Sequence, residues 1–217
     1  MFGLPMSTKT QAGKKVIMKP VSVDEAAIFA EGFSRYPIMR TLSIRAAMSL
    51  EMEEQWIRDS DKDSSKMGWG IYVDGELVGN TGFDGIDNRR ATSGCCIFRD
   101  DLWGQGIISA VHLARSYYGV QVLGLEAVDS YVFFGNDASL KALLRVGYAA
   151  YGVKIAEQIL NGKRTHAHQL LWVNPNARQW NAFWDGPIPD QYANKFAESR
   201  KRARLALRQA EKNVTFL

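Results

Sequence analysis

Cysteine and histidine are scarce in this chain, which limits the disulfide and metal frameworks that it can build. Its 217 residues include two cysteines and three histidines. Cys95 and Cys96 are adjacent on an expected strand, where successive side chains point to opposite faces, so we expect no disulfide between them. No further cysteine or close histidine completes a zinc site, and His166 and His168 fit an exposed strand face better than a metal. We interpret both cysteines as packing residues in a reducing compartment and expect no metal.

Long apolar runs, internal repeats and the core of a signal peptide are also lacking. A membrane-spanning helix needs about 18 consecutive apolar residues, and no run approaches that length. Residues 1–14 have no secretory apolar core, and we expect them to form a flexible arm. The remaining composition, with 46% hydrophobic and 23% charged residues, is ordinary for a soluble globular protein. These features predict a cytoplasmic protein without membrane contact, built as one domain with an appendage.

A glycine turn in the middle of the chain is the first positive signal. A strand-like run at residues 92–98 comes before it and a helical pattern comes after it. The turn itself reads Trp103-Gly104-Gln105-Gly106-Ile107-Ile108. The first amide N–H groups of a helix lack partners and carry partial positive charge, and glycines let an anion approach that backbone closely. The turn is therefore a candidate phosphate site, although many such turns only satisfy backbone geometry.

A second strand and helix follow the first pair. Residues 131–134 read as a strand, Asn136-Asp137-Ala138-Ser139 as the start of a short helix, and Gly147-Tyr148 as its exit. Asparagine is a common helix cap, so Asn136 can serve that purpose with or without a further role.

The order strand, Trp-Gly-x-Gly, helix, strand, Asn-x-x-Ser, helix, Gly-Tyr resembles the GNAT superfamily of acetyl-CoA-dependent N-acetyltransferases. Within it, the chain is most similar to the ribosomal-protein alanine acetyltransferases, over residues 15–174. The resemblance implies an α/β fold with a mixed, mostly antiparallel central sheet and helices on both faces. The turns Asp74-Gly75 and Asn161-Gly162, each between two strand-like runs, agree with hairpins in such a sheet.

The resemblance also implies a cofactor site for acetyl-CoA as co-substrate. Its pyrophosphate would lie on the amides of the glycine turn, and its pantetheine arm would pair with the backbone of Ile97 and Phe98. Asn136 would contact that arm, Ser139 would lie near the sulfur, and Lys141 could meet a phosphate or simply face solvent. The predicted cofactor set is Ile97, Phe98, Trp103, Gly104, Gln105, Gly106, Ile107, Ile108, Asn136, Ser139 and Lys141.

Three positions depart from the pattern of the relatives. Their general-acid tyrosine corresponds to Leu143, the position of their catalytic glutamate is Tyr131, and Ile108 stands where they have a small residue. We take Ser139, Asn136 and Tyr131 as the catalytic candidates, with Ser139 as proton donor or thiolate stabiliser. No side-chain base is identified, and deprotonation of the amine through water leaves four unranked carboxylates: Asp84, Asp87, Glu126 and Asp129.

Two helices are expected before the first hairpin, in the region that lines the acceptor groove of the GNAT fold. Asp24 should cap the first helix, with Ile28 on its buried face, and Ser49 should begin the second. Possible acceptor contacts here, or equally a solvated face, are Arg35, Tyr36, Arg40 and Arg45.

Residues 175–217 form an aromatic-rich connector and a basic helix. The connector contains Trp180, Phe183 and Trp184, which favour packing on the domain. Residues 190–212 contain seven basic and three acidic residues, and 7 − 3 = +4 equals the net charge of the whole chain.

Two explanations are open for the helix of residues 190–212. We expect it to dock through Tyr192, Phe196 and Leu207 on its own domain or on a twin subunit, which would make a homodimer. RNA contact by its basic face is the less favoured alternative.

The sequence thus predicts an enzyme that moves an acetyl group from acetyl-CoA to a primary amine by direct attack in a ternary complex. The amine, a small molecule or a protein N-terminus, is not readable, because groove residues follow the substrate rather than the fold. The alternative is a non-catalytic, CoA-binding GNAT scaffold with a regulatory or assembly role. The departures at Leu143 and Tyr131 keep that alternative open.

Overall fold

A computed structural model describes residues 1–42, 46–160, 162–177 and 188–217. The strands are β1 (Met6–Lys9), β2 (Lys15–Lys19), β3 (Met67–Val73), β4 (Glu76–Asp87), β5 (Arg90–Ile97), β6 (Ala127–Phe133), β7 (Ala149–Leu160), β8 (Lys163–Val173) and β9 (Thr215–Phe216). The α-helices are α1 (Ala26–Ser34), α2 (Tyr36–Leu42), α3 (Leu50–Ser60), α4 (Ile107–Gln121), α5 (Asp137–Arg145) and α6 (Asp190–Asn213). None of the described helices is long and apolar enough to cross a membrane.

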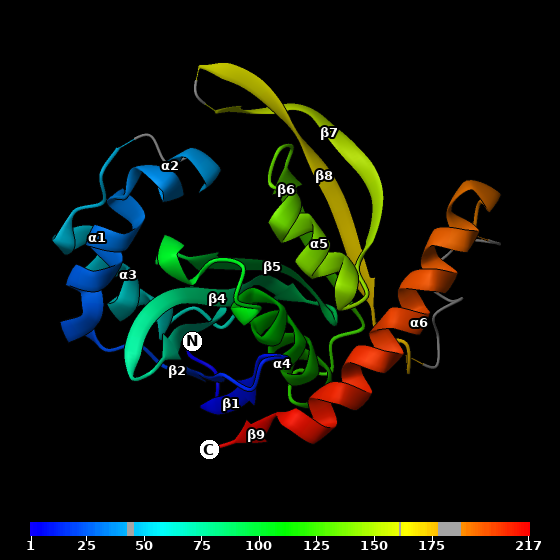
Figure 1. Cartoon of the computed structure of the whole chain (residues 1–217), viewed down its shortest axis with the longest axis horizontal. Helices are drawn as coiled ribbons and strands as arrows, with labels where there is room; N and C mark the ends of the chain where they lie inside the picture. The colour runs from blue at the N-terminus through cyan, green and yellow to red at the C-terminus, as the bar shows by residue number, and fades with distance from the viewer. Residues whose placement is uncertain (43–45, 161, 178–187) are drawn as a thin grey trace.

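The described strands form one sheet in the order β7-β8-β6-β5-β4-β3-β2-β1-β9. Its ladders are antiparallel except for the one between β5 and β6, which is parallel. Helices α1 to α3 cover one face, and α4, α5 and α6 pack on the other (Figure 1). A separate apolar core lies under each layer, so the predicted mixed, mostly antiparallel sheet with helices on both faces is confirmed.

Local turn and cap chemistry is where it was expected. Asp74 and Gly75 join β3 to β4 with positive φ angles of 53° and 87°, as a tight hairpin requires. Ser49 caps α3, because its Oγ accepts a hydrogen bond from Met52 N–H over 3.2 Å. Gly162 precedes β8, but Asn161 lies outside the described residues.

The start of the first helix differs from the expectation. Asp24 lies inside a short 3-10 turn (Val23–Glu25), and Ser22 precedes that turn and donates its N–H to Glu25 Oε2 over 2.9 Å. The buried face of α1 also differs from the expected one: Phe29 is fully buried, whereas Ile28 is 42% exposed. Phe29 lies on the buried face because its ring packs against the ring of Phe98, a contact that local periodicity does not reveal.

The N-terminal segment also differs, because it is part of the sheet rather than a flexible arm. β1 pairs with β2 on one side and with β9, at the other end of the chain, on its second side. Met6 is fully buried, and Leu217 N–H donates to Pro5 O over 2.9 Å. A four-residue strand gives little sequence signal, and its second neighbour comes from more than 200 residues away, so only the fold reveals it.

The basic helix α6 docks on its own domain, as the sequence predicted. Phe196 and Leu207 are buried, and Tyr192 packs beside Phe196. Ser199 Oγ donates to Gly147 O, and a Cβ on Gly147 would lie 2.5 Å from Ala203 N, so the helix backbone passes directly over this glycine. The predicted anchors Trp180, Phe183 and Trp184 lie outside the described residues.

Candidate active site

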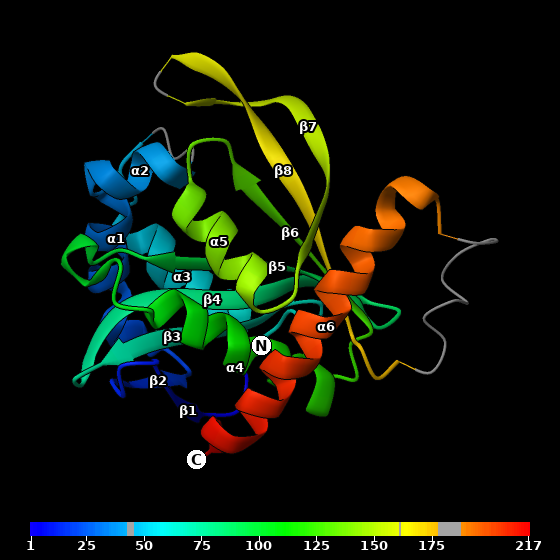
Figure 2. The same ribbon diagram turned by 45° about the vertical axis from the view of Figure 1, so that its right-hand side comes forward.

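The two parallel strands at the centre of the sheet separate partway along their length. β5 and β6 pair only over 90–92 and 127–129. Two serines then connect them: Ser93 Oγ donates to Asp129 O and Ser130 Oγ donates to Ser93 O, each over 3.2 Å. Past these serines no ladder joins the described parts of the two strands, and Figure 2 shows β6 and β8 turning away from β5. We call this break in the ladder the β5–β6 opening.

Backbone groups along a strand alternate in direction, and this decides which of them face the β5–β6 opening. Phe98 N–H donates to β4 over 3.0 Å, so Cys95 and Ile97 face the opposite way, toward β6. Ile97 O accepts from Trp103 Nε1 over 2.9 Å, and Phe98 O accepts from Arg35 Nη1 over 2.8 Å. Both backbone groups of Phe98 are engaged within the protein, contrary to its expected pairing. The backbone of Cys95 and the N–H of Ile97 face the opening instead.

The glycine turn follows β5 and starts α4. Gly104 and Gly106 both have φ of 79°, the left-handed conformation that glycine adopts without strain, and Gly106 caps the helix. The side chain of Ile107 is buried and that of Ile108 packs against the same core. The first-turn N–H groups therefore point out of the helix end while the bulky side chains point inward, which suits an anion.

The start of α5 lies beyond the end of β6. Asn136 Oδ1 accepts from Ser139 N–H over 3.2 Å and so caps this helix. Ser139 is half-buried in the first turn, whereas Lys141 is exposed on the helix surface. The structure thus brings Asn136 and Ser139 together, and it confirms the capping interpretation of Asn136.

Tyr131 projects from the other face of β6. Its neighbours Val128 and Val132, with the opposite parity, lie in the core under α4 and α5, so the Tyr131 side chain is on the face of α1 to α3. The ring is 43% exposed, and Lys154 Nζ of β7 lies 4.1 Å from its centroid. Tyr131 is therefore on the opposite side of the sheet from Ser139, and Lys154 is a neighbour that the sequence did not indicate.

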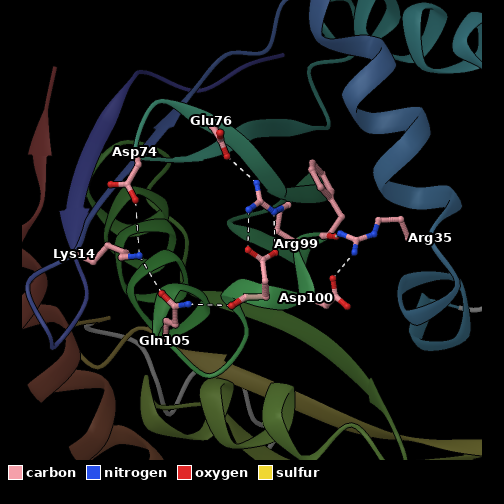
Figure 3. Close-up of polar contacts among 9 residues, drawn as sticks. Lys14, Arg35, Asp74, Glu76, Arg99, Asp100 and Gln105 are labelled. Atoms are coloured by element: carbon pink, nitrogen blue, oxygen red, sulfur yellow. Dashed lines mark hydrogen bonds and ion pairs between the residues drawn. The ribbon is translucent and has the colours of Figure 1, made fainter.

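Polar contacts tie the residues around the glycine turn to other parts of the chain (Figure 3). Arg35, which follows α1, forms an ion pair with Asp100. Arg99 donates to Asp101 Oδ2 and to Glu76 Oε2, each over 2.7 Å. These contacts connect the turn to the first helix and to the β3–β4 hairpin, which makes it a braced loop rather than a loose one.

A cavity of about 430 Å³ lies beside this bracing, on the α1 side of the sheet. Its lining includes Arg35, Phe98 and Arg99, together with Glu31 and Glu76. Of the four predicted acceptor contacts, Arg35 lines it, Tyr36 and Arg40 are exposed outside it, and Arg45 lies outside the described residues.

Comparison with known proteins decides the family. Residues 15–149 match the family model described as "Acetyltransferase (GNAT) domain", which is more than half of the chain. The chain belongs to the GNAT acetyltransferases. The N-acetyltransferase YoaA of Bacillus subtilis (strain 168), itself uncharacterised, is 27% identical over 168 residues, which are 74% of this chain and 94% of YoaA.

Solved structures show the same fold. RimJ of Mycobacterium smegmatis, in complex with CoA-disulfide, has a TM-score of 0.70 and 15% identity, and the match covers 98% of this chain and 97% of RimJ. The spermidine N-acetyltransferase of Vibrio cholerae, with CoA and spermine, has a TM-score of 0.67 and 15% identity, covering 73% of this chain and 95% of that structure. The match to RimJ covers 98% of this chain and so extends to residues beyond 174, whereas the family model ends at residue 149.

Leu143 and Asp129 bear on which side chain could act as acid or base in this GNAT chain. Leu143, at the position of the relatives' tyrosine, is buried in the core. Among the four unranked carboxylates, Asp129 alone borders the β5–β6 opening, and it accepts two hydrogen bonds from Arg90, over 2.6 and 2.8 Å. This pairing raises the pKa of Arg90, so the guanidinium stays charged and holds the carboxylate in place.

The cysteines and histidines of the described residues form no metal site. Cys95 and Cys96 are free thiols that pack on opposite faces of β5, and burial raises the pKa of both. His166 and His168 lie against the ring of Phe134, with His168 stacked at 4.4 Å. His112 is buried on α4, and neither of its ring nitrogens has a hydrogen-bond partner. These residues are structural, and a buried neutral thiol is a poor nucleophile.

Proposed function

We propose that this GNAT protein transfers the acetyl group of acetyl-CoA to a primary amine by direct attack within a ternary complex. The observation that carries the proposal is the β5–β6 opening, with a helix start suited to phosphate after β5 on one side and the Asn136–Ser139 turn after β6 on the other. An extended, amide-rich chain can pair with strand edges, and Cys95, the N–H of Ile97 and the edge of β6 offer such pairing.

The two faces of the opening suit two substrates. Cofactor contacts come from the α4 and α5 face, and the acceptor would enter from the face of α1 to α3, where Tyr131 and Lys154 lie. Holding both substrates across one opening replaces a bimolecular encounter by an oriented one, which is a large part of such a catalytic effect.

The chemistry needs few side chains. The amine nitrogen forms a bond to the acetyl carbonyl carbon, the carbon–sulfur bond breaks, and the thiolate takes a proton. Ser139 is our candidate to donate to that sulfur, and the proton lost by nitrogen leaves through water, with Asp129 as the nearest carboxylate to the opening. Tyr131 is proposed to position the acceptor rather than to carry a proton.

The class of amine remains a matter for experiment. The structural relatives include an acetyltransferase for spermidine and RimL, an α-N-acetyltransferase of ribosomal L7/L12, so both a polyamine and a protein N-terminus are candidates. Placement among the ribosomal-protein enzymes, a cytoplasmic location, a homodimer through α6 and RNA contact stay predictions. The free cysteines of β5 support a reducing compartment.

The deciding assay measures thiol release from acetyl-CoA across a panel of polyamines, amino-terminal peptides and aminoglycosides. Transfer to at least one amine, with the acetylated amine found by mass spectrometry, is the expected result. CoA binding by calorimetry without transfer to any amine would instead favour the non-catalytic scaffold.

A further inference from the structure

We propose that Lys14, directly before β2, is a ligand for the cofactor pyrophosphate, delivered to the glycine turn by the N-terminal hairpin. This inference rests on the proposed function, since it concerns how the same site holds CoA. It also gives the hairpin a role that its sequence did not suggest.

The hairpin turn places Lys14 rigidly. Thr10 N–H donates to Lys14 O over 2.9 Å, Lys14 N–H donates to Thr10 Oγ1 over 3.1 Å, and Gly13 has the left-handed φ of 85°. Thr10 is buried, and its Cβ would lie 3.8 Å from a Cβ on Gly106. The β1–β2 turn therefore packs against the glycine turn, and Lys14 starts from a fixed backbone position.

The Lys14 side chain reaches the glycine turn itself. Its Nζ donates to Gln105 Oε1 over 3.0 Å, and Gln105 Nε2 donates in turn to Asp101 O over 3.0 Å, which orients the amide (Figure 3). Gln105 directly precedes Gly106, the cap of α4. An ammonium group has three donors, so one bond to Gln105 leaves donors for an anion at the helix start.

Among the described cations that contact the turn, Lys14 is the one whose charge is not paired at short distance with a carboxylate. Arg35 pairs with Asp100, and Arg99 holds Asp101 and Glu76 at 2.7 Å, so both guanidinium charges are neutralised locally. The contact of Lys14 with a carboxylate is longer, 3.8 Å to Asp74, whose side chain is 77% exposed. Its short contact is with an amide oxygen, which carries no net charge.

The surrounding carboxylates make this cation necessary. Asp74, Glu76, Asp100 and Asp101 are four acids against three cations in the contacts around the turn. Without Lys14, a doubly charged pyrophosphate would meet helix-start amides in an acidic neighbourhood, where the repulsion offsets the contribution of the helix end.

The test is calorimetric titration of CoA and of 3′-dephospho-CoA into the wild type, Lys14→Gln and Lys15→Gln. Lys15 is exposed on the same hairpin, so Lys15→Gln removes the same charge one residue away. Lys14→Gln should weaken the binding of both ligands by about 10- to 150-fold, the range of a charge-assisted hydrogen bond, and Lys15→Gln by less than about 2-fold.

A change in the opposite direction strengthens the test against simple misfolding. Asp74→Asn removes the carboxylate that faces Lys14, and it should tighten CoA binding by about 2-fold at low salt, an effect that salt screens. A variant that is merely misfolded cannot bind CoA more tightly than the wild type.

Each of the other outcomes contradicts a specific part of the proposal. Unchanged affinity in Lys14→Gln, or equal losses in both lysine variants, would remove Lys14 from the site. A loss for CoA but not for 3′-dephospho-CoA would move it from the pyrophosphate to the 3′-phosphate. A wild type that binds neither ligand would overturn the proposed function itself and this inference with it.

Discussion

Ser139 stands at the third position of α5, where its own N–H is already used by the Asn136 cap. The cap does not need the Ser139 hydroxyl, so the hydroxyl can be removed without loosening the helix start. Ser139→Ala should lower kcat by roughly 10- to 1,000-fold, near the lower part of the range for a positioned proton donor, with little change in CoA affinity. Steady-state thiol release and CoA calorimetry on one preparation check both parts. A fully active alanine variant would leave Ser139 as a helix-start residue only.

The contribution of His112 to the free energy of unfolding depends on pH. Burial disfavours its imidazolium form and the neighbouring Arg115 charge adds repulsion, so the pKa of His112 lies well below its usual value. Below about pH 6.5 the unfolded histidine takes up a proton that the folded one refuses, so the free energy of unfolding falls as pH falls. The loss is about 1.4 kcal/mol per pH unit until the folded pKa is reached.

Replacing His112 should make the free energy of unfolding less dependent on pH. His112→Leu removes the buried titrating group, so its loss of unfolding free energy between pH 7.5 and pH 5.5 should be smaller than that of the wild type by at least about 1 kcal/mol. Urea unfolding at the two pH values measures this difference, in which the contributions of all other titrating groups cancel. Identical losses in the two proteins would show that folded His112 takes up its proton with the same pKa as in the unfolded chain.

At the scale of elements, the glycine turn both sets the backbone geometry at the start of α4 and leaves that backbone open to phosphate. Gly104 and Gly106 have the same φ of 79°, but only Gly106 caps α4. Alanine at either position should cost about 1 kcal/mol of folding free energy, because a Cβ is strained in this conformation. Gly106→Ala should in addition weaken CoA binding by roughly 10-fold or more, because a Cβ there strains the left-handed cap that directs the first N–H groups of α4. Calorimetry on this matched pair is the measurement, and equal CoA affinities would contradict the phosphate site.

The helix α6 behaves as a structural element of the domain. Leu207 is buried against it, whereas Leu205 on the same helix is 65% exposed. Leu207→Ala should lower the free energy of unfolding by about 2 to 4 kcal/mol, and the control Leu205→Ala by less than about 0.5 kcal/mol. Denaturant unfolding of the two variants gives the comparison. A Leu207 variant as stable as its control would mean that α6 is not docked in solution.

For the whole molecule, the two ends of the chain close the same edge of the sheet. β9 pairs with β1, and β1 continues into the hairpin that carries Lys14. Loss of the C-terminal segment should therefore affect both solubility, through the apolar face exposed on the domain, and the cofactor site, through the freed hairpin.

Truncation before Asp190 tests this coupling. The shortened chain should aggregate or melt at a lower temperature, and any soluble fraction should bind CoA more weakly than the full chain. Light scattering, thermal unfolding and CoA calorimetry give the three readouts. A monodisperse product with the stability, CoA affinity and activity of the full chain would contradict a structural role for α6.

Much of this protein was determined by local sequence. Asp-Gly at 74–75 adopts the positive φ angles of a hairpin, Ser49 caps a helix, and the two glycines of the turn take up left-handed conformations. The position of the glycine turn was read from the sequence directly, and the GNAT sheet was expected from the family resemblance that the order of motifs around that turn carries. The reason is physical: turn geometry, caps and periodicity depend on neighbours within a few residues.

The tertiary structure decided what depends on partners far away in the chain. Arg35 and Trp103 occupy carbonyls that the sequence predicted to be open, so the pairing edge moves toward Cys95. The segment taken for an arm becomes β1, because its neighbours lie at both ends of the chain, and Lys14 meets Gln105 from 91 residues away. Hydrogen bonds and ion pairs between such residues leave no periodic trace in the sequence, so only folding brings their charges and backbone groups to one place.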